Sequence, residues 1–242
     1  MSFKWQRFPW VDSEFARARW MYSVGMLYLL LGYLGTNEIA ALNPWHRPAL
    51  PIATVWDASL PFVPWTVVFY TMYFPLLATP LFLAPSPAAI TRLTIAQAGM
   101  NTLAYVVFLV FPTPIDRPAA HPVEGVFHIL LDTLFRADHP YNTFPSLHVA
   151  QSCLLALFYM SYSAHLCVGP QNLSAVRKNR FAVRVFFAHT IAGLLIAISA
   201  VLIKQHYIAD AMSGALLAAA AYGLIFKSDS RSNGSSPLKS LR

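Results

Sequence analysis

Six long apolar segments constrain the fold of this chain more than any other feature. The chain has 242 residues, of which 57% are hydrophobic and only 11% are charged. Soluble domains carry about 25% charged residues, whereas a helix that crosses a bilayer needs about 20 mainly apolar residues. Six segments meet this requirement: Trp20–Ile39, Phe62–Leu83, Leu93–Phe111, His148–Val168, Phe181–Ile203 and Tyr207–Phe226. The sequence therefore predicts an all-α fold, an integral membrane bundle of six transmembrane helices.

The chain divides into three parts. Residues 1–19 mix aromatic and basic side chains, which predicts a segment lying on the membrane surface. Residues 20–226 form a single six-span membrane domain. Residues 227–242 are polar and lack aromatic side chains, which predicts a disordered tail. Within the domain, three prolines in residues 62–83 predict a kinked second span, and Val123–Phe135 has a helix-like pattern inside the longest external loop.

The basic residues predict how the chain is oriented in the membrane. Six spans place the two termini and the second and fourth loops on one side, and that side carries 13 of the 17 lysines and arginines. The other four are Arg47, Arg117, Arg136 and Lys204. Because basic loops stay cytoplasmic, both termini are predicted inside. The net charge of +7 then suits the anionic lipid headgroups of the inner leaflet, and nucleic acid is not an expected partner.

Two polar motifs interrupt this apolar chain at the predicted outer ends of spans. The first runs from Asn142 to His148, and the second contains His206 and Asp210. Residues four apart lie on one face of a helix, so Asp210 is expected to orient the His206 imidazole and leave its other nitrogen free as a base or nucleophile. His148 is expected to act as an acid toward a leaving oxygen.

A site for an anion is expected beside these histidines. Ser146 lies at the start of a predicted helix, where backbone N–H groups favour a negatively charged ligand. Arg117 and Lys204 add positive charge on the same predicted side. The spacing alone is a weak signal, since His128 and Asp132 repeat it. The combination is stronger, because ionisable groups close to membrane spans are costly and tend to be functional.

These motifs resemble those of the type 2 phosphatidic acid phosphatase superfamily over roughly residues 55–226. The segment ending in Phe144-Pro-Ser-Leu-His148 resembles the family's PSGH signature, with Leu147 in place of glycine. His206-Tyr-Ile-Ala-Asp210 resembles the end of SRxxxxxHxxxD, with Ala200 in place of arginine.

The first family signature, KxxxxxxRP, is matched only at Arg117-Pro118, with Val110 in place of lysine. These departures resemble a branch that includes fungal inositol phosphorylceramide synthase and many bacterial relatives.

The resemblance implies a six-helix enzyme with its site at the outer face, periplasmic in a bacterial inner membrane or otherwise lumenal. His206 would form a phosphohistidine, with Asp210 orienting it and His148 protonating the leaving group. Ser146 and Arg117 would hold phosphate oxygens, and Lys204 is the candidate substitute for the missing arginine. The implied chemistry requires no metal and no other cofactor. The implied partner is a lipid phosphate in the bilayer.

Three functions remain open at this point. The first is a phosphatase that hydrolyses a lipid phosphomonoester or diphosphate. The second is a phosphotransferase that passes a phosphate-bearing group to an alcohol, for which Asp57 is the expected acceptor contact. The third is a transporter or a non-catalytic relative, which the nearly charge-free spans and the retained histidines disfavour. The lipid, the acceptor and the oligomeric state are not specified by the sequence.

Overall fold

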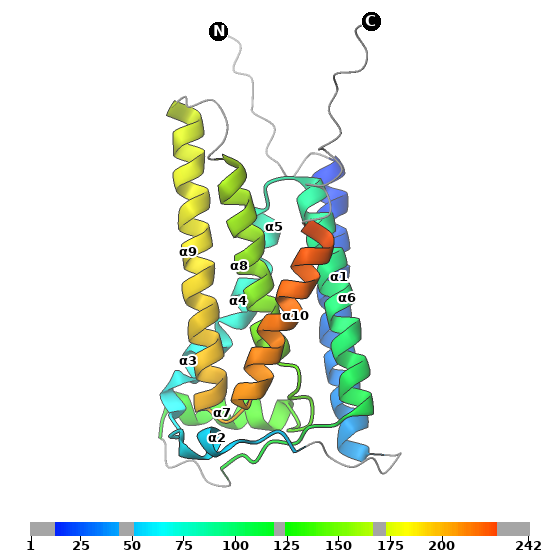
Figure 1. Cartoon of the computed structure of the whole chain (residues 1–242), viewed down its shortest axis with the longest axis vertical. Helices are drawn as coiled ribbons and strands as arrows, with labels where there is room; N and C mark the ends of the chain where they lie inside the picture. Colours follow the sequence, from blue (N-terminus) through cyan, green and yellow to red (C-terminus); the bar gives the residue numbers. More distant parts are fainter. Residues whose placement is uncertain (1–12, 44–50, 119–123, 167–172, 227–242) are drawn as a thin grey trace, which may run out of the picture.

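The computed structural model describes residues 13–43, 51–118, 124–166 and 173–226, and in these ranges the chain is mainly helical (Figure 1). The tail 227–242 and most of the predicted surface segment lie outside the described residues. Residues 13–19 of that segment continue the first helix. The helices are α1 (Ser13–Leu42), α2 (Val55–Ser59), η1 (Pro64–Thr66), α3 (Val67–Thr71), α4 (Tyr73–Ala78), α5 (Pro80–Leu83), α6 (Pro87–Val110), α7 (Val126–Ala137), α8 (Leu147–Leu166), α9 (Leu173–Leu202) and α10 (Ile208–Phe226).

The second predicted span is a chain of short helices because prolines interrupt it. Pro64 opens η1 and Pro80 opens α5, positions where the missing proline N–H costs nothing. Pro75 lies in the first turn of α4 and follows the break at Met72. The kink predicted from these prolines is therefore present, as several changes of helix within Pro64–Leu83.

The all-helical prediction is confirmed, and five of the described helical stretches are long and apolar enough to cross a membrane. They are Ser13–Leu42, Pro64–Leu83, Pro87–Val110, Arg180–Leu202 and Ile208–Phe226. Large apolar side chains stay exposed on their outer faces, including Leu31, Leu103, Leu194, Leu216 and Leu224. In water such a surface would be costly, whereas acyl chains cover it at no cost. The chain is thus built as an integral membrane protein.

The sixth predicted span folds as helix α8 but is not among those five stretches. Figure 1 shows α8 between α9 and α10, and it also packs on α6 and α4. This interior position admits polar side chains. Gln151 is fully buried, accepts a hydrogen bond from Gln97 (2.8 Å) and donates one to Asn101 (2.6 Å). These hydrogen bonds join α6 to α8, and the polar side chain of Gln151 lowers the apolar content of α8.

Helix α10 approaches the start of α8 unusually closely at Gly214. A Cβ at this position would lie 2.3 Å from the Ser146 carbonyl oxygen and 3.2 Å from the Ala150 nitrogen. The same junction is joined by a hydrogen bond from the Ser146 N–H to the Asp210 carbonyl (3.0 Å). The first turn of α10 and the turn before α8 are therefore held against each other.

The two ends of the bundle are formed by different elements. At one end lie the start of α1 and the end of α10, and at the other lie α2, α7 and the connection between α9 and α10 (Figure 1). Ser146 and His206 both belong to the second end, because one precedes α8 and the other precedes α10. The fold thus gathers the polar motifs at a single end of the bundle.

Candidate active site

The two motif histidines meet in the interior of the protein. His148 Nδ1 lies 3.5 Å from His206 Nε2, and their ring centroids are 5.6 Å apart. Both side chains are buried. A leaving oxygen hydrogen-bonded to His148 would alone take up about 2.8 Å. The rings must therefore move apart for a phosphorus atom to enter between them.

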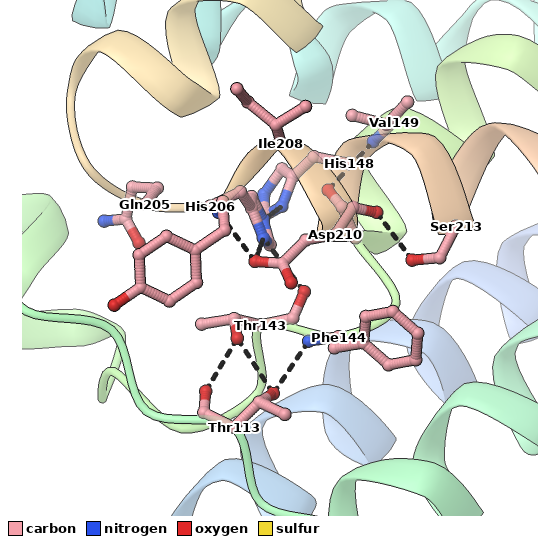
Figure 2. A network of polar contacts seen from close by, with 12 residues as sticks. Thr113, Thr143, Phe144, His148, Val149, Gln205, His206, Ile208, Asp210 and Ser213 are labelled. Atoms are coloured by element: carbon pink, nitrogen blue, oxygen red, sulfur yellow. Dashed lines mark hydrogen bonds and ion pairs between the residues drawn. The ribbon is translucent and has the colours of Figure 1, made fainter. Parts of the chain in front are cut away.

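The orientation of His206 is set mainly by a backbone carbonyl. His206 Nδ1 lies 3.0 Å from the Thr143 carbonyl oxygen and 3.5 Å from Asp210 Oδ2 (Figure 2). A carbonyl only accepts hydrogen bonds, so Nδ1 carries the proton and Nε2 presents its lone pair toward His148. Asp210 is fully buried, and its Oδ2 accepts a hydrogen bond from the Tyr207 N–H (2.8 Å). The carboxylate expected to orient His206 thus shares that role with Thr143.

Two loops are joined beneath this histidine (Figure 2). The Thr143 hydroxyl donates to the Thr113 carbonyl (2.6 Å) and contacts the Thr113 hydroxyl (2.8 Å), which also accepts from the Phe144 N–H (2.9 Å). Thr113 and Asn142 form a parallel bridge. Because these contacts fix the Thr143 carbonyl, they also fix the His206 tautomer.

Ser146 lies at the start of α8, as predicted. Its side chain is fully buried, and its hydroxyl oxygen accepts a long hydrogen bond from the Val149 N–H (3.4 Å). This is the geometry of a helix N-cap. The first N–H groups of the 20-residue helix α8 carry the positive end of the helix dipole. His148 lies in this first turn, so the surroundings of its side chain favour an anion.

Arg117 is held beside the site by several acceptors. Its guanidinium donates to the carbonyl oxygens of Asp138 and Phe135 and to the Gln205 side chain, and it lies 3.5 Å from the Asp138 carboxylate. Burial lowers the Arg117 pKa, and the charge of Asp138 opposes this shift. Burial also raises the Asp138 pKa, against the opposing effect of Arg117. Gln205 is the residue next to His206, so this hydrogen bond connects Arg117 to the second histidine motif.

Lys204 has a different set of contacts. Its ammonium group donates to the carbonyl oxygens of Asp57 (2.9 Å) and Leu60 (2.8 Å). The Asp57 carboxylate in turn accepts from the Ile208 N–H (2.8 Å) and from the backbone and hydroxyl of Thr54. Burial raises the Asp57 pKa, but these hydrogen bonds and Lys204 outweigh it, and the net pKa shift is downward. Helix α2 is therefore attached to the start of α10.

These contacts bear on two expectations. A phosphate role for Lys204 stays a prediction, and it requires the ammonium group to leave both carbonyls. The Asp57 carboxylate already accepts three hydrogen bonds, so few of its lone pairs remain for the hydroxyl of an acceptor alcohol.

The second histidine–aspartate pair has other surroundings: His128 is exposed on α7, and Asp132 pairs with Arg136 (2.9 Å). Among the described residues, no three of His, Cys, Asp and Glu form a group that could hold a metal ion.

Sequence reasoning missed several residues around the histidines. Tyr70 donates or accepts a hydrogen bond at His148 Nδ1 (3.1 Å), and Tyr33 and Tyr73 pack their rings against His148. Tyr33 also donates to Asp138 (2.8 Å). All of them come from apolar helices or loops, where no local pattern distinguishes a site residue from a core residue.

Comparison with known proteins identifies the family of the chain. A model of one protein family, the PAP2 superfamily, matches residues 88–233. No curated protein and no solved structure matches the chain. The family match includes Arg117 and both histidine motifs, but it does not select the branch suggested by the leucine of PSLH. Since it covers more than half of the sequence, the chain belongs to the PAP2 superfamily, whose enzymes are phosphatases and phosphotransferases acting on phosphate esters.

Proposed function

We propose that this protein is a membrane lipid phosphatase that hydrolyses a lipid phosphomonoester or diphosphate through a phosphohistidine on His206. The observation that carries the lipid assignment is an apolar cavity of about 210 Å³ whose wall contains His148. Its other walls come from α1, the α3–α4 segment, α7 and the start of α8.

The cavity continues along the outside of the bundle. A second cavity of about 360 Å³ lies between α1 and the α4–α5 segment and shares Leu29, Leu30, Tyr73 and Phe74 with the first. Phe74 and Leu30 are exposed to the surroundings. Together the cavities offer a hydrocarbon chain an apolar path from the membrane to His148, which a water-soluble phosphate ester would not need.

The proposed reaction uses both histidines. His206 Nε2 attacks the phosphorus, the bond from phosphorus to the lipid oxygen breaks, and protonated His148 gives its proton to that oxygen. Water then attacks the phosphorus, His148 takes up a proton from it, and the P–N bond breaks to release phosphate. Asp210 and the Thr143 carbonyl stabilise the proton on His206 Nδ1. Ser146, Arg117 and the N–H groups at the start of α8 would stabilise the phosphoryl oxygens.

Transfer to an alcohol remains the second candidate, because it shares the phosphohistidine step. The PSLH motif favours it, since the resemblance places this motif in a branch that includes a synthase. Against it, the Asp57 carboxylate is engaged with Ile208 and Thr54, and α2 is fixed to α10 rather than free to position an acceptor. Hydrolysis is therefore the better supported outcome.

We further propose that α8 is the sixth span and that the site faces the outer side of the membrane. Helices α1, α6 and α9 begin at the other end of the bundle (Figure 1), and Arg17, Arg19, Arg92 and Arg184 lie in their first halves, as the distribution of charge requires. Labelling of single cysteines in intact cells tests this topology. A probe at Asp116 should react from outside, whereas one at Ser86 should not, and the reverse pattern would refute the orientation.

The function is tested with purified protein and a panel of lipid phosphates and diphosphates. Inorganic phosphate should appear without any added alcohol, and an acid-labile phosphoenzyme should be trapped at early times. The matched variant His206→Ala should give neither. If phosphate is released only from water-soluble esters, the lipid assignment fails. If no phosphate is released but an added polyol or sphingoid alcohol yields a new phosphodiester lipid, the transferase is the correct assignment.

A further inference from the structure

The Arg117–Asp138 pair lies within the site. The two side chains are only 10% and 11% exposed, and the Asp138 carboxylate is the one acid that the structure places on Arg117 among the described residues. Asp138 also belongs to the wall of the cavity that contains His148. The arginine expected to hold phosphate is thus paired with an internal anion at the edge of the reaction centre.

Asp138 is held in place from the opposite side by α1. Its Oδ1 accepts hydrogen bonds from the Tyr33 hydroxyl (2.8 Å) and from the Asn37 amide (2.7 Å). The Tyr33 ring lies edge-on to His148, with the ring centroids 6.3 Å apart. With Oδ1 held in this way, Asp138 presents its other oxygen, Oδ2, to Arg117 (3.5 Å), where a phosphate oxygen could also pair.

The guanidinium has capacity for another ligand. Arg117 Nε is buried and has no hydrogen-bond partner among the described residues, and the same is true of Gln205 Nε2. Buried donors without partners are costly. A phosphate oxygen at Nε and Nη would satisfy this donor in the bidentate geometry that arginine prefers.

A phosphate and the Asp138 carboxylate cannot both pair closely with Arg117, because two like charges a few ångströms apart repel strongly in a buried site. We propose, building on the proposed phosphatase function, that Asp138 is an internal competitor of the substrate's phosphate: it neutralises Arg117 before binding and releases it when phosphate arrives. Asp138 is in this sense a residue that sets affinity, not a catalytic one.

Release of Arg117 leaves a buried carboxylate, which must be stabilised in another way. The hydrogen bonds from Tyr33 and Asn37 remain available to it. Burial already raises the Asp138 pKa, so uptake of a proton is a second route by which its charge is removed. Either route makes exchange of Asp138 for phosphate reversible.

The test is binding of inorganic phosphate to the purified protein, measured by calorimetry, together with KM and kcat for phosphate release. Asp138→Asn keeps the shape of the side chain and removes its charge. If Asp138 competes, phosphate should bind about tenfold more tightly, since the repulsion between like charges is gone, and KM should fall. The matched control Asp132→Asn, a partly exposed acid on α7 that pairs with Arg136, should leave both unchanged.

Weaker phosphate binding by Asp138→Asn overturns the proposal. If Asp138 only positions Arg117, Asp138→Asn should weaken phosphate binding and raise KM. Should this variant not fold, Asp138→Ala gives a second readout: it also removes the carboxylate, so competition predicts tighter phosphate binding and positioning predicts weaker binding. Unchanged binding in the folded variants also overturns the proposal while leaving the phosphatase function intact. Absence of phosphate binding to the wild-type protein and to Asp138→Asn would overturn the proposal, and absence of phosphate release by both proteins would overturn the phosphatase function as well.

Discussion

Gly214→Ala is expected to damage the site without touching any ionisable group. The added methyl carbon would lie 2.3 Å from the Ser146 carbonyl oxygen, where ordinary contact begins at 3.4 Å. Its neighbours are backbone atoms, which cannot rotate away as the end of a side chain would. The start of α10 and the turn before α8 must therefore move apart by about 1 Å, and a misplacement of this size costs roughly 100-fold in rate.

The cost in stability should be smaller than the cost in activity. Overpacking a core typically costs about 1–3 kcal/mol, and alanine returns up to about 1 kcal/mol of helix propensity relative to glycine. We expect a Tm lowered by a few degrees and a kcat/KM for phosphate release lowered by about two orders of magnitude. The large loss arises because Ser146, His148, His206 and Asp210 all depend on this junction.

Gly223→Ala is the matched control on the same helix, because no atom lies within 4 Å of a Cβ built there. It should fold and turn over like the wild type, with an equal or higher Tm. Phosphate release is followed in detergent micelles or proteoliposomes, and unfolding is followed by differential scanning fluorimetry. A Gly214→Ala protein with near-normal kcat/KM would refute the claim that this close approach holds the site together.

The other predictions concern individual side chains. His206→Ala and His148→Ala should each reduce phosphate release by several orders of magnitude in folded protein, whereas His128→Ala should keep most activity; equal losses at His128 and His206 would mean that the wrong pair was chosen. Lys204→Met should lower the Tm because α2 loses its attachment, and if its main effect is instead on KM, Lys204 is a phosphate ligand. The pKa of Asp57 is lowered in the folded protein. The ionised carboxylate should therefore stabilise the fold at pH values above its pKa in the unfolded chain, about 4, and this stabilisation should be lost as the pH falls through its pKa in the folded protein. The Tm of Asp57→Asn should therefore be lower at neutral pH and fall less in acid, and identical Tm profiles in the two proteins would contradict this.

The sequence predicted most of the helices because the bilayer imposes a length and an apolar composition on each span. The limits of α10 lie within one residue of the prediction, whereas α6 ends one residue before the predicted end and begins six residues before the predicted start. Helix α2 was not predicted, since five residues give no periodic signal. It forms because Thr54 and Asp57 make a capping box and because Lys204 and Ile208 bind it from a distant part of the chain.

The histidine pair was predictable, but its environment was not. His148 and His206 stand in motifs with recognisable spacing, and the fold does bring them together. The Thr143 carbonyl that orients His206 has no sequence signal, because every residue carries a carbonyl. Asp138 was equally hidden, since an acid at the end of a helix-like stretch is usually a solvated surface residue. Only the fold shows that α1 and Arg117 surround it.

The charge balance of the site follows from these contacts. A membrane enzyme that binds a phosphate must supply positive charge near the hydrocarbon region, where an unpaired cation is costly. In this protein Lys204 donates to carbonyls and Arg117 pairs with Asp138, so neither cation stands alone before the substrate binds. The groups that remain to receive a phosphate are dipoles and single donors: the start of α8, the Arg117 Nε and the imidazoles. These groups gain most when negative charge arrives, and the Arg117 Nε then gains the acceptor that it lacks among the described residues; such fixed donors are the arrangement that electrostatic catalysis requires.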